Sequence, residues 1–132
     1  MSEGETPFAF APGGHAIVAH GLGAFAFAGM RHEGSILATP RGVRPLEART
    51  IDEIDERTLA LLFTELVEAP GSIEFLIVGT GERIGRLREG LRAALRATGV
   101  RFEAMATGPA LRVYNVMQAE DRRVAAALIA VP

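Results

Sequence analysis

Residues 73–85 read IEFLIVGTGERIG and decide the fold, because they join a buried strand to a tight glycine turn. The first six residues are almost continuously apolar and rich in β-branched side chains, which is typical of a strand covered on both faces. A Gly-Thr-Gly turn at 79–81 follows, and the arginine-rich segment 84–98 then has helical periodicity. The stretch therefore predicts a central strand of an α/β sheet that turns sharply into a helix.

Helical and strand patterns alternate on both sides of this central strand. Residues 55–68 have apolar side chains at spacings of three and four, which predicts a helix, and Asp55 can cap its amino end. The segments 100–105 and 124–131 are predicted strands, although the second also permits a helix, and a third helix is predicted from Thr107. This order predicts a single three-layer α/β domain, with a mixed, mostly parallel central sheet and helices on both sides.

The amino-terminal half has a β texture with many glycine turns. Residues 24–28 alternate phenylalanine with alanine, which is the period-two pattern of a half-buried strand. The segment 35–39 follows a turn at 31–34, so these two strands are predicted to form a β-hairpin. Residues 1–14 are rich in glycine and proline and are predicted to be a flexible arm, which leaves 15–132 as the single domain.

Composition excludes several classes of chemistry. The chain has 132 residues, of which 48% are hydrophobic, enough for a core without covalent cross-links, and it contains no cysteine. Disulfides and thiol nucleophiles are therefore excluded, and the absence of lysine excludes a Schiff base or a P-loop lysine. The formal net charge of -2 argues against nucleic acid as a partner.

The amino-terminal sequence MSEGETPFAF is acidic and lacks the basic stretch and apolar run of a targeting signal. Nowhere does an apolar run approach the roughly 20 residues that span a bilayer as a helix. We therefore expect a cytoplasmic protein that does not insert into a membrane.

The Gly-Thr-Gly turn admits more than one interpretation. Gly79 and Gly81 match half of a dinucleotide-binding fingerprint, but Ile84 stands where the third glycine belongs. The simplest alternative is a tight turn in which glycine avoids a side-chain clash. In a third interpretation, the amide groups of 80–83 at a helix start bind a small anion together with the Arg83 guanidinium. The turn also lies at the carboxyl end of a central strand, where open α/β sheets usually bind ligands.

Other polar residues give weaker signals. The histidines at 15, 20 and 32 have neither metal-ligand spacing nor accompanying carboxylates, so no metal site and no cofactor are predicted. No serine stands in a nucleophile-elbow motif, and no catalytic residue is assigned. The arginines at 88, 92 and 96 share one face of the predicted helix, which is typical of a solvated surface, with a partner-binding stripe as the alternative.

The segment 105–129 has the densest set of specific polar side chains. Glu120 with Arg122 or Arg123 is predicted to form an ion pair that fixes the loop before the last strand. Asn115 or Tyr114 in the preceding helix is a candidate pocket residue.

The order and spacing of these motifs resemble those of a small uncharacterised domain family of bacteria and archaea. Its animal relatives include a mitochondrial respiratory complex I assembly factor and an adipogenesis-associated cytosolic protein. The resemblance covers residues 15–130, essentially the whole predicted domain. The motifs that carry it are Gly79-Thr80-Gly81, Met105-Ala106-Thr107, Ala110, Tyr114-Asn115, Glu120, the segment 123–129 and the Gly34-Ser35 turn.

This resemblance implies a single α/β domain with a mixed central sheet, helices on both sides and no established catalytic activity. It also implies a cleft near the Gly-Thr-Gly turn. The best-described mitochondrial relative acts through protein partners in respiratory complex assembly, whereas no mitochondrial presequence is evident in this sequence.

Three functional hypotheses follow. The first is a non-enzymatic binding or assembly-factor-like module that acts through protein partners and has an anion-binding cleft. The second is an enzyme or sensor for a small acidic or phosphorylated metabolite in the same cleft, where Arg83 binds the anion and Glu120 acts as acid or base. The third is a homo-oligomer that adds strands at an exposed hairpin edge. The predicted ligand-binding residues of the cleft are Gly79, Thr80, Gly81, Arg83, Thr107 and Asn115.

Overall fold

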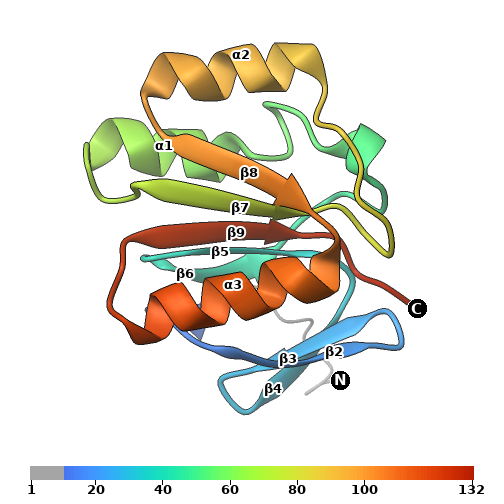
Figure 1. Cartoon of the computed structure of the whole chain (residues 1–132). Helices are drawn as coiled ribbons and strands as arrows, with labels where there is room; N and C mark the ends of the chain where they lie inside the picture. Colours follow the sequence, from blue (N-terminus) through green and yellow to red (C-terminus); the bar gives the residue numbers. More distant parts are fainter. Residues whose placement is uncertain (1–10) are drawn as a thin grey trace, which may run out of the picture.

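The computed structural model describes residues 11–132, which form two β-sheets and three α-helices (Figure 1). The larger sheet has six strands in the order β1-β6-β5-β9-β7-β8, and the smaller has three in the order β2-β3-β4. The strands of the larger sheet are β1 (Ala11–Pro12), β5 (Ile36–Thr39), β6 (Gly42–Pro45), β7 (Phe75–Gly79), β8 (Arg101–Met105) and β9 (Val124–Leu128). The remaining elements are β2 (Ile17–Gly21), β3 (Ala24–Phe27), β4 (Met30–Glu33), α1 (Ala60–Glu68), α2 (Glu89–Thr98), α3 (Thr107–Ala119) and the short 3-10 helix η2 (Ile51–Glu53).

The larger sheet is mixed, as predicted. Strands β8 and β9 both pair with β7 in parallel, whereas β5, β6 and β1 continue the sheet by antiparallel pairing. The predicted predominance of parallel pairing therefore holds only for the three carboxyl-terminal strands. The reason lies in the connection, because β5 and β6 are joined by residues 40 and 41 alone, and so short a link permits only a hairpin.

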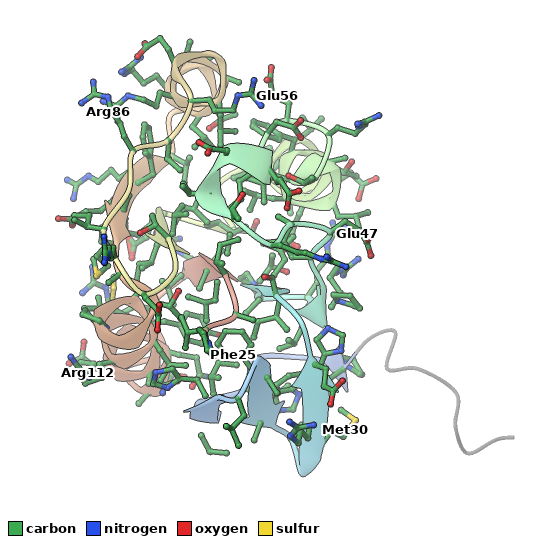
Figure 2. The ribbon with its side chains drawn as sticks, turned by 90° about the vertical axis from the view of Figure 1, so that its right-hand side faces the viewer. Phe25, Met30, Glu47, Glu56, Arg86 and Arg112 are labelled. Carbon is green, nitrogen blue, oxygen red and sulfur yellow. The ribbon has the colours of Figure 1, made fainter. Side chains whose placement is uncertain are left out.

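Three layers surround this sheet, which confirms the predicted architecture. Helices α1 and α2 pack on one face, and α3 with the smaller sheet covers the other (Figures 1 and 2). Phe25 of β3 points from the smaller sheet into the second interface, as Figure 2 shows. All five residues of β9 are buried, which identifies VAAAL as the predicted strand, and its three alanines let both outer layers approach closely.

One predicted strand pairing is wrong. Residues 24–28 and 35–39 do not form a hairpin, because β3 pairs with β4 and β5 lies beside β9 in the larger sheet. Ala28 and Gly29 have φ angles of 50° and 74°, a combination that makes a two-residue turn and reverses the chain immediately. Strand β5 has all four residues buried, as a strand covered on both faces requires.

Two helices begin later than predicted. The segment 56–59 forms turns before α1, and the Asp55 carboxylate accepts a hydrogen bond from the Thr58 N–H at 2.9 Å, so Asp55 caps this turn. Helix α2 begins only at Glu89, so residues 80–88 form a loop between β7 and α2. The turn at the end of β7 therefore does not lead directly into a helix.

Residues 1–10 of the predicted flexible arm lie outside the described residues. The described part of that arm begins with β1, in which the buried Ala11 pairs with Val43, so the sheet starts inside the predicted arm. Between residues 11 and 132, none of the helices has the length and apolar character needed to cross a membrane.

Candidate functional site

The Gly-Thr-Gly turn closes onto the start of α3 through several hydrogen bonds. The Gly81 N–H donates to Thr107 Oγ1 at 2.9 Å, and the Thr107 N–H donates to the Gly81 carbonyl at 2.8 Å. Thr107 Oγ1 also donates to the Ile129 carbonyl at 2.8 Å, so one buried hydroxyl joins β7, α3 and the end of β9. The Ile129 N–H donates to the Gly79 carbonyl at 2.9 Å. We call Gly79, Thr80, Gly81, Thr107 and Ile129 the carboxyl-end corner, because the three parallel strands end there.

Thr80 uses both its backbone and its side chain within this corner. Its N–H donates to the Met105 carbonyl at 2.8 Å, and its Oγ1 donates to the Arg83 carbonyl at 2.6 Å and accepts from the Gly85 N–H at 2.9 Å. The predicted free amide groups of Thr80 and Gly81 are therefore already used inside the protein. Since the turn does not lead into a helix either, the prediction that these two amides present donors to an anion is wrong.

The two glycines of the turn have steric reasons to be glycine. A Cβ on Gly79 would lie 2.9 Å from Leu128 Cδ2 and 3.0 Å from Thr107 Cα, closer than real side chains approach. Gly81 has a φ of 111°, a left-handed conformation that favours glycine. Of the three interpretations of the motif, these contacts support the tight turn.

The remaining predicted site residues lie apart from one another. Asn115 lies eight residues beyond Thr107 in α3, a rise of about 12 Å, and its amide oxygen and nitrogen both bond the backbone of Ile17 at 2.8 Å. Glu120 lies thirteen residues beyond Thr107, a rise of about 20 Å, whereas Arg83 is an exposed residue of the loop 80–88. The structure does not bring Arg83 and Glu120 together, so they do not form the predicted anion and acid–base pair.

The acidic residue that pairs with Arg122 and Arg123 is Glu74, whereas Glu120 was predicted. Arg122 and Arg123 both lie near Glu74, with Arg122 Nε 3.5 Å from Glu74 Oε1 and an Arg123 terminal nitrogen 3.6 Å from Glu74 Oε2. Glu74 immediately precedes β7, and the parallel pairing of β7 with β9 brings it next to the residues that precede β9. The loop before the last strand is thus tied to the start of the central strand.

A buried tyrosine anchors the middle of α3. The Tyr114 hydroxyl donates to the His15 carbonyl at 3.2 Å, and burial raises the pKa of Tyr114 to about 12. A phenol with so high a pKa stays neutral near neutral pH. Tyr114 therefore acts as a packing and hydrogen-bonding residue.

A hollow of ≈ 590 Å³ lies between the loop 80–88, α2 and β8. Its lining includes the hydrophobic side chains of Ile84, Leu87 and Phe102, and the Arg92 guanidinium lies 5.9 Å from the centre of the Phe102 ring. The six predicted ligand-binding residues are all missing from this lining. Within residues 11–132, no group of three histidine, aspartate or glutamate side chains could hold a metal ion.

Exposed apolar residues at the carboxyl end of the strands escaped the sequence analysis. Leu22, at the tip of the β2–β3 hairpin, is 87% exposed, and Ile84 in the loop 80–88 is 71% exposed. The tip is held at this end because the Gly23 N–H donates to the Val131 carbonyl at 2.6 Å. Figure 2 looks onto this end of the molecule, and Figure 1 shows both the hairpin tip and the loop beside the strand arrowheads. The signal in the sequence was Gly-Leu-Gly between two strand patterns, with leucine where a tight turn prefers asparagine.

The opposite end of the parallel strands carries an open cavity of ≈ 440 Å³. Its charged lining residues are Arg101, Arg122, Arg123 and Glu74, all at or just before the first residue of a strand. The sequence analysis assigned Arg122 and Arg123 to a structural ion pair and gave Arg101 no separate role. An arginine at or just before the first residue of each of the two strands that flank β7 was the available signal.

The fold and the corner define a small α/β domain in which the Gly-Thr-Gly turn closes onto Thr107. Over residues 17–129 the chain matches the family described as a protein of unknown function (DUF498/DUF598), and it belongs to that family. The resemblance inferred from the motifs is thereby confirmed.

The chain is also similar to three individual proteins. An uncharacterised protein of Rhodobacter capsulatus is 36% identical over 114 residues, which is 86% of this chain and 82% of the relative. The bovine NADH dehydrogenase [ubiquinone] 1 alpha subcomplex assembly factor 3 is 31% identical over 108 residues, and the match spans 82% of this chain but 56% of the bovine protein. The solution structure of the Rpa2829 protein from Rhodopseudomonas palustris is 42% identical, has a TM-score of 0.78, and the match covers 99% of this chain and 94% of that one.

Proposed function

We propose that this chain is a non-enzymatic, assembly-factor-like module, and that a protein partner with an apolar surface docks on the tip of its β2–β3 hairpin. The observation that carries the proposal is the conformation and exposure of Leu22. Its side chain is 87% exposed and its φ is 54°.

Neither property of Leu22 favours folding. A left-handed backbone costs a residue such as leucine about 1–2 kcal/mol, and an exposed side chain recovers nothing by burial. Asparagine or glycine would fit the same turn at lower free energy. A strained, exposed leucine is therefore explained better by a contact that forms outside the chain.

The surroundings of the tip support a protein partner. Val18 in β2 is 73% exposed, and a shallow, mainly apolar hollow of ≈ 250 Å³ lies beside Leu22. Two bonds hold the tip in place, since the Gly23 N–H donates to the Val131 carbonyl and the Gly34 N–H donates to the Gly23 carbonyl. A pre-positioned apolar group of this kind binds with little loss of conformational freedom. Similarity to an assembly factor over 82% of the chain agrees with a role in protein contacts.

Substitution of Leu22 by asparagine separates binding from folding. Asparagine suits the left-handed turn, so the Leu22→Asn variant keeps the hairpin and loses only the apolar side chain. The Ala28→Asn variant is the matched control, because Ala28 occupies the same position of a two-residue turn at the other end of β3, with a φ of 50°. Each protein is immobilised and exposed to an extract of its native cells, and the captured proteins are identified by mass spectrometry.

We expect one protein to be captured by the unmodified chain and by Ala28→Asn, and to be lost from Leu22→Asn. Capture should persist at about 0.5 M salt, where exposed charge pairs are screened but apolar contacts are not. Equal capture by Leu22→Asn would contradict the docking surface, as would capture that salt abolishes. If the only protein retained were a second copy of this chain, self-association would replace the proposal.

A further inference from the structure

We propose that the amino ends of β7, β8 and β9 form a binding site for a small phosphate monoester that carries an apolar group. The site is the ≈ 440 Å³ cavity described above, and we call it the amino-end cavity. It lies at the opposite end of the strands from the docking surface, and the inference does not depend on that proposal.

Parallel pairing brings the charged residues of this cavity together. Phe75 of β7 is in register with Arg101 of β8 and with Val124 of β9. Glu74 and Arg123 directly precede two of these aligned positions, so the charged side chains converge at one edge of the sheet. Arg101 is thus positioned by the hydrogen-bonded framework of the sheet, and Glu74 and Arg123 directly precede strands of that framework.

The charges of the cavity favour a dianion. The Arg122 and Arg123 guanidinium groups lie beside the carboxylate of Glu74, and Arg101 also lines the cavity, so its charged residues sum to about +2. The two arginine–glutamate distances of 3.5 and 3.6 Å are longer than those of strong charge-assisted hydrogen bonds, about 2.8 Å. A phosphate group can therefore compete with Glu74 for the two guanidinium groups, and Arg101 adds further donors.

The rest of the lining selects what the phosphate is attached to. Hydrophobic side chains from α1, β7 and the residues that flank them complete the cavity wall, namely Leu66, Ile73, Phe75 and Val100. An apolar substituent on the phosphate gains free energy by covering this surface. The carboxyl end of α2 also reaches the cavity and disfavours an anion, but one of its carbonyls, that of Leu95, is bonded by the Thr98 hydroxyl at 2.6 Å.

A nuclear magnetic resonance titration at low salt tests the site, with phenyl phosphate and inorganic phosphate as probes. For phenyl phosphate we expect saturable binding with a Kd of about 1 mM or tighter, and weaker binding of inorganic phosphate. The amide signals that move should belong to residues 99–101 and 122–124. Arg101→Ala should weaken binding by about fivefold, whereas Glu74→Gln should strengthen it by about threefold, because the competing carboxylate is lost.

Arg112→Ala provides the matched control, because Arg112 is an exposed arginine on α3 that points away from the body in Figure 2 and does not line the cavity. This variant should bind phenyl phosphate as the unmodified chain does. If Arg101→Ala and Arg112→Ala weakened phenyl phosphate binding equally, the binding would reflect general charge attraction, and the proposed site would be wrong. Failure of phenyl phosphate to saturate, weaker binding by Glu74→Gln, or equal affinity for the two probes would also overturn it. All three substituted side chains are exposed or partly exposed, and an unchanged amide spectrum elsewhere verifies the fold of each variant.

Discussion

The two ends of the parallel strands β7, β8 and β9 use their polar groups in opposite ways. At the carboxyl-end corner, the amide groups of Thr80 and Gly81 bond acceptors within the protein, and Thr107 completes the closure. At the amino-end cavity, Arg101, Arg122 and Arg123 line an open space with one carboxylate among them. Open α/β sheets usually bind ligands in the crevice at the carboxyl ends of their strands. In this chain the Thr80 and Gly81 amides are bonded within the protein, so the carboxyl-end corner is a structural joint, which means that it connects elements of the fold and leaves neither N–H free for a ligand.

The largest expected effect comes from removing the hydroxyl that closes the corner. Thr107→Val keeps the shape of the side chain but leaves the Gly81 N–H and the Ile129 carbonyl without their buried partner. We expect the free energy of unfolding to fall by about 3 kcal/mol, measured by urea denaturation. The control is Thr64→Val on the exposed side of α1, which should change stability by less than about 0.5 kcal/mol. A loss at Thr107 no larger than that at Thr64 would show that the corner is not a structural joint.

A methyl group on Gly79 tests the same joint by steric means. In Gly79→Ala the new Cβ would meet Leu128 Cδ2 and the Thr107 backbone at 2.9 and 3.0 Å, so we expect the free energy of unfolding to fall by about 2 kcal/mol. The same substitution at Gly90 in α2 meets only Glu56 Oε1 at 4.0 Å and should stabilise the helix by about 0.5 kcal/mol. Opposite signs in the two variants support a close approach at Gly79, and a neutral Gly79→Ala would refute it.

The sequence predicts a feature well when neighbouring residues determine it, and poorly when residues far apart in the chain determine it. The central strands β7 and β9 were predicted because continuous apolar runs report burial directly. The pairing of β3 was missed because it depends on the left-handed conformation of Ala28, a residue that rarely adopts it. The start of α2 was misplaced because the Gly85 N–H bonds the Thr80 hydroxyl, and Gly85 packs against Ile51, which lies 34 residues earlier in the chain.

The same argument explains what was right and wrong at the candidate site. The tight Gly-Thr-Gly turn after the central strand was predicted, but its amide groups are bonded by acceptors on Met105 and Thr107, which are far from it in sequence. Arg101 was not linked with Arg122 and Arg123, because only the register of three parallel strands brings them together. Spacing along the chain could not predict either arrangement.

A smaller effect is expected at the tip of the β2–β3 hairpin, where Leu22 is exposed at the carboxyl end of the parallel strands. Leu22→Asn should raise the free energy of unfolding by about 0.5 kcal/mol, because asparagine tolerates the left-handed backbone better than leucine. Thermal and urea unfolding of the variant and the unmodified chain measure this change. A clear loss of stability would mean that Leu22 supports the fold, and would remove the argument that its exposure serves a partner.

The smallest effect is expected at the amino end. Glu74→Gln removes the carboxylate shared by Arg122 and Arg123, but these ion pairs are partly exposed and long, so stability should change by less than about 0.5 kcal/mol. Urea denaturation in low and high salt measures the change. A loss comparable to that of Thr107→Val would show that the charges at the two ends are equally structural, and the contrast between the ends would disappear.

Hydrogen exchange of the Thr80 and Gly81 amides tests the central contrast most directly. We predict that both protons exchange only through opening of the corner, with protection close to that of the central strands, and that phenyl phosphate leaves their signals in place. Exchange at the rate of an unstructured peptide, together with movement of these signals on addition of phenyl phosphate, would mean that the amides are free donors and would contradict the account.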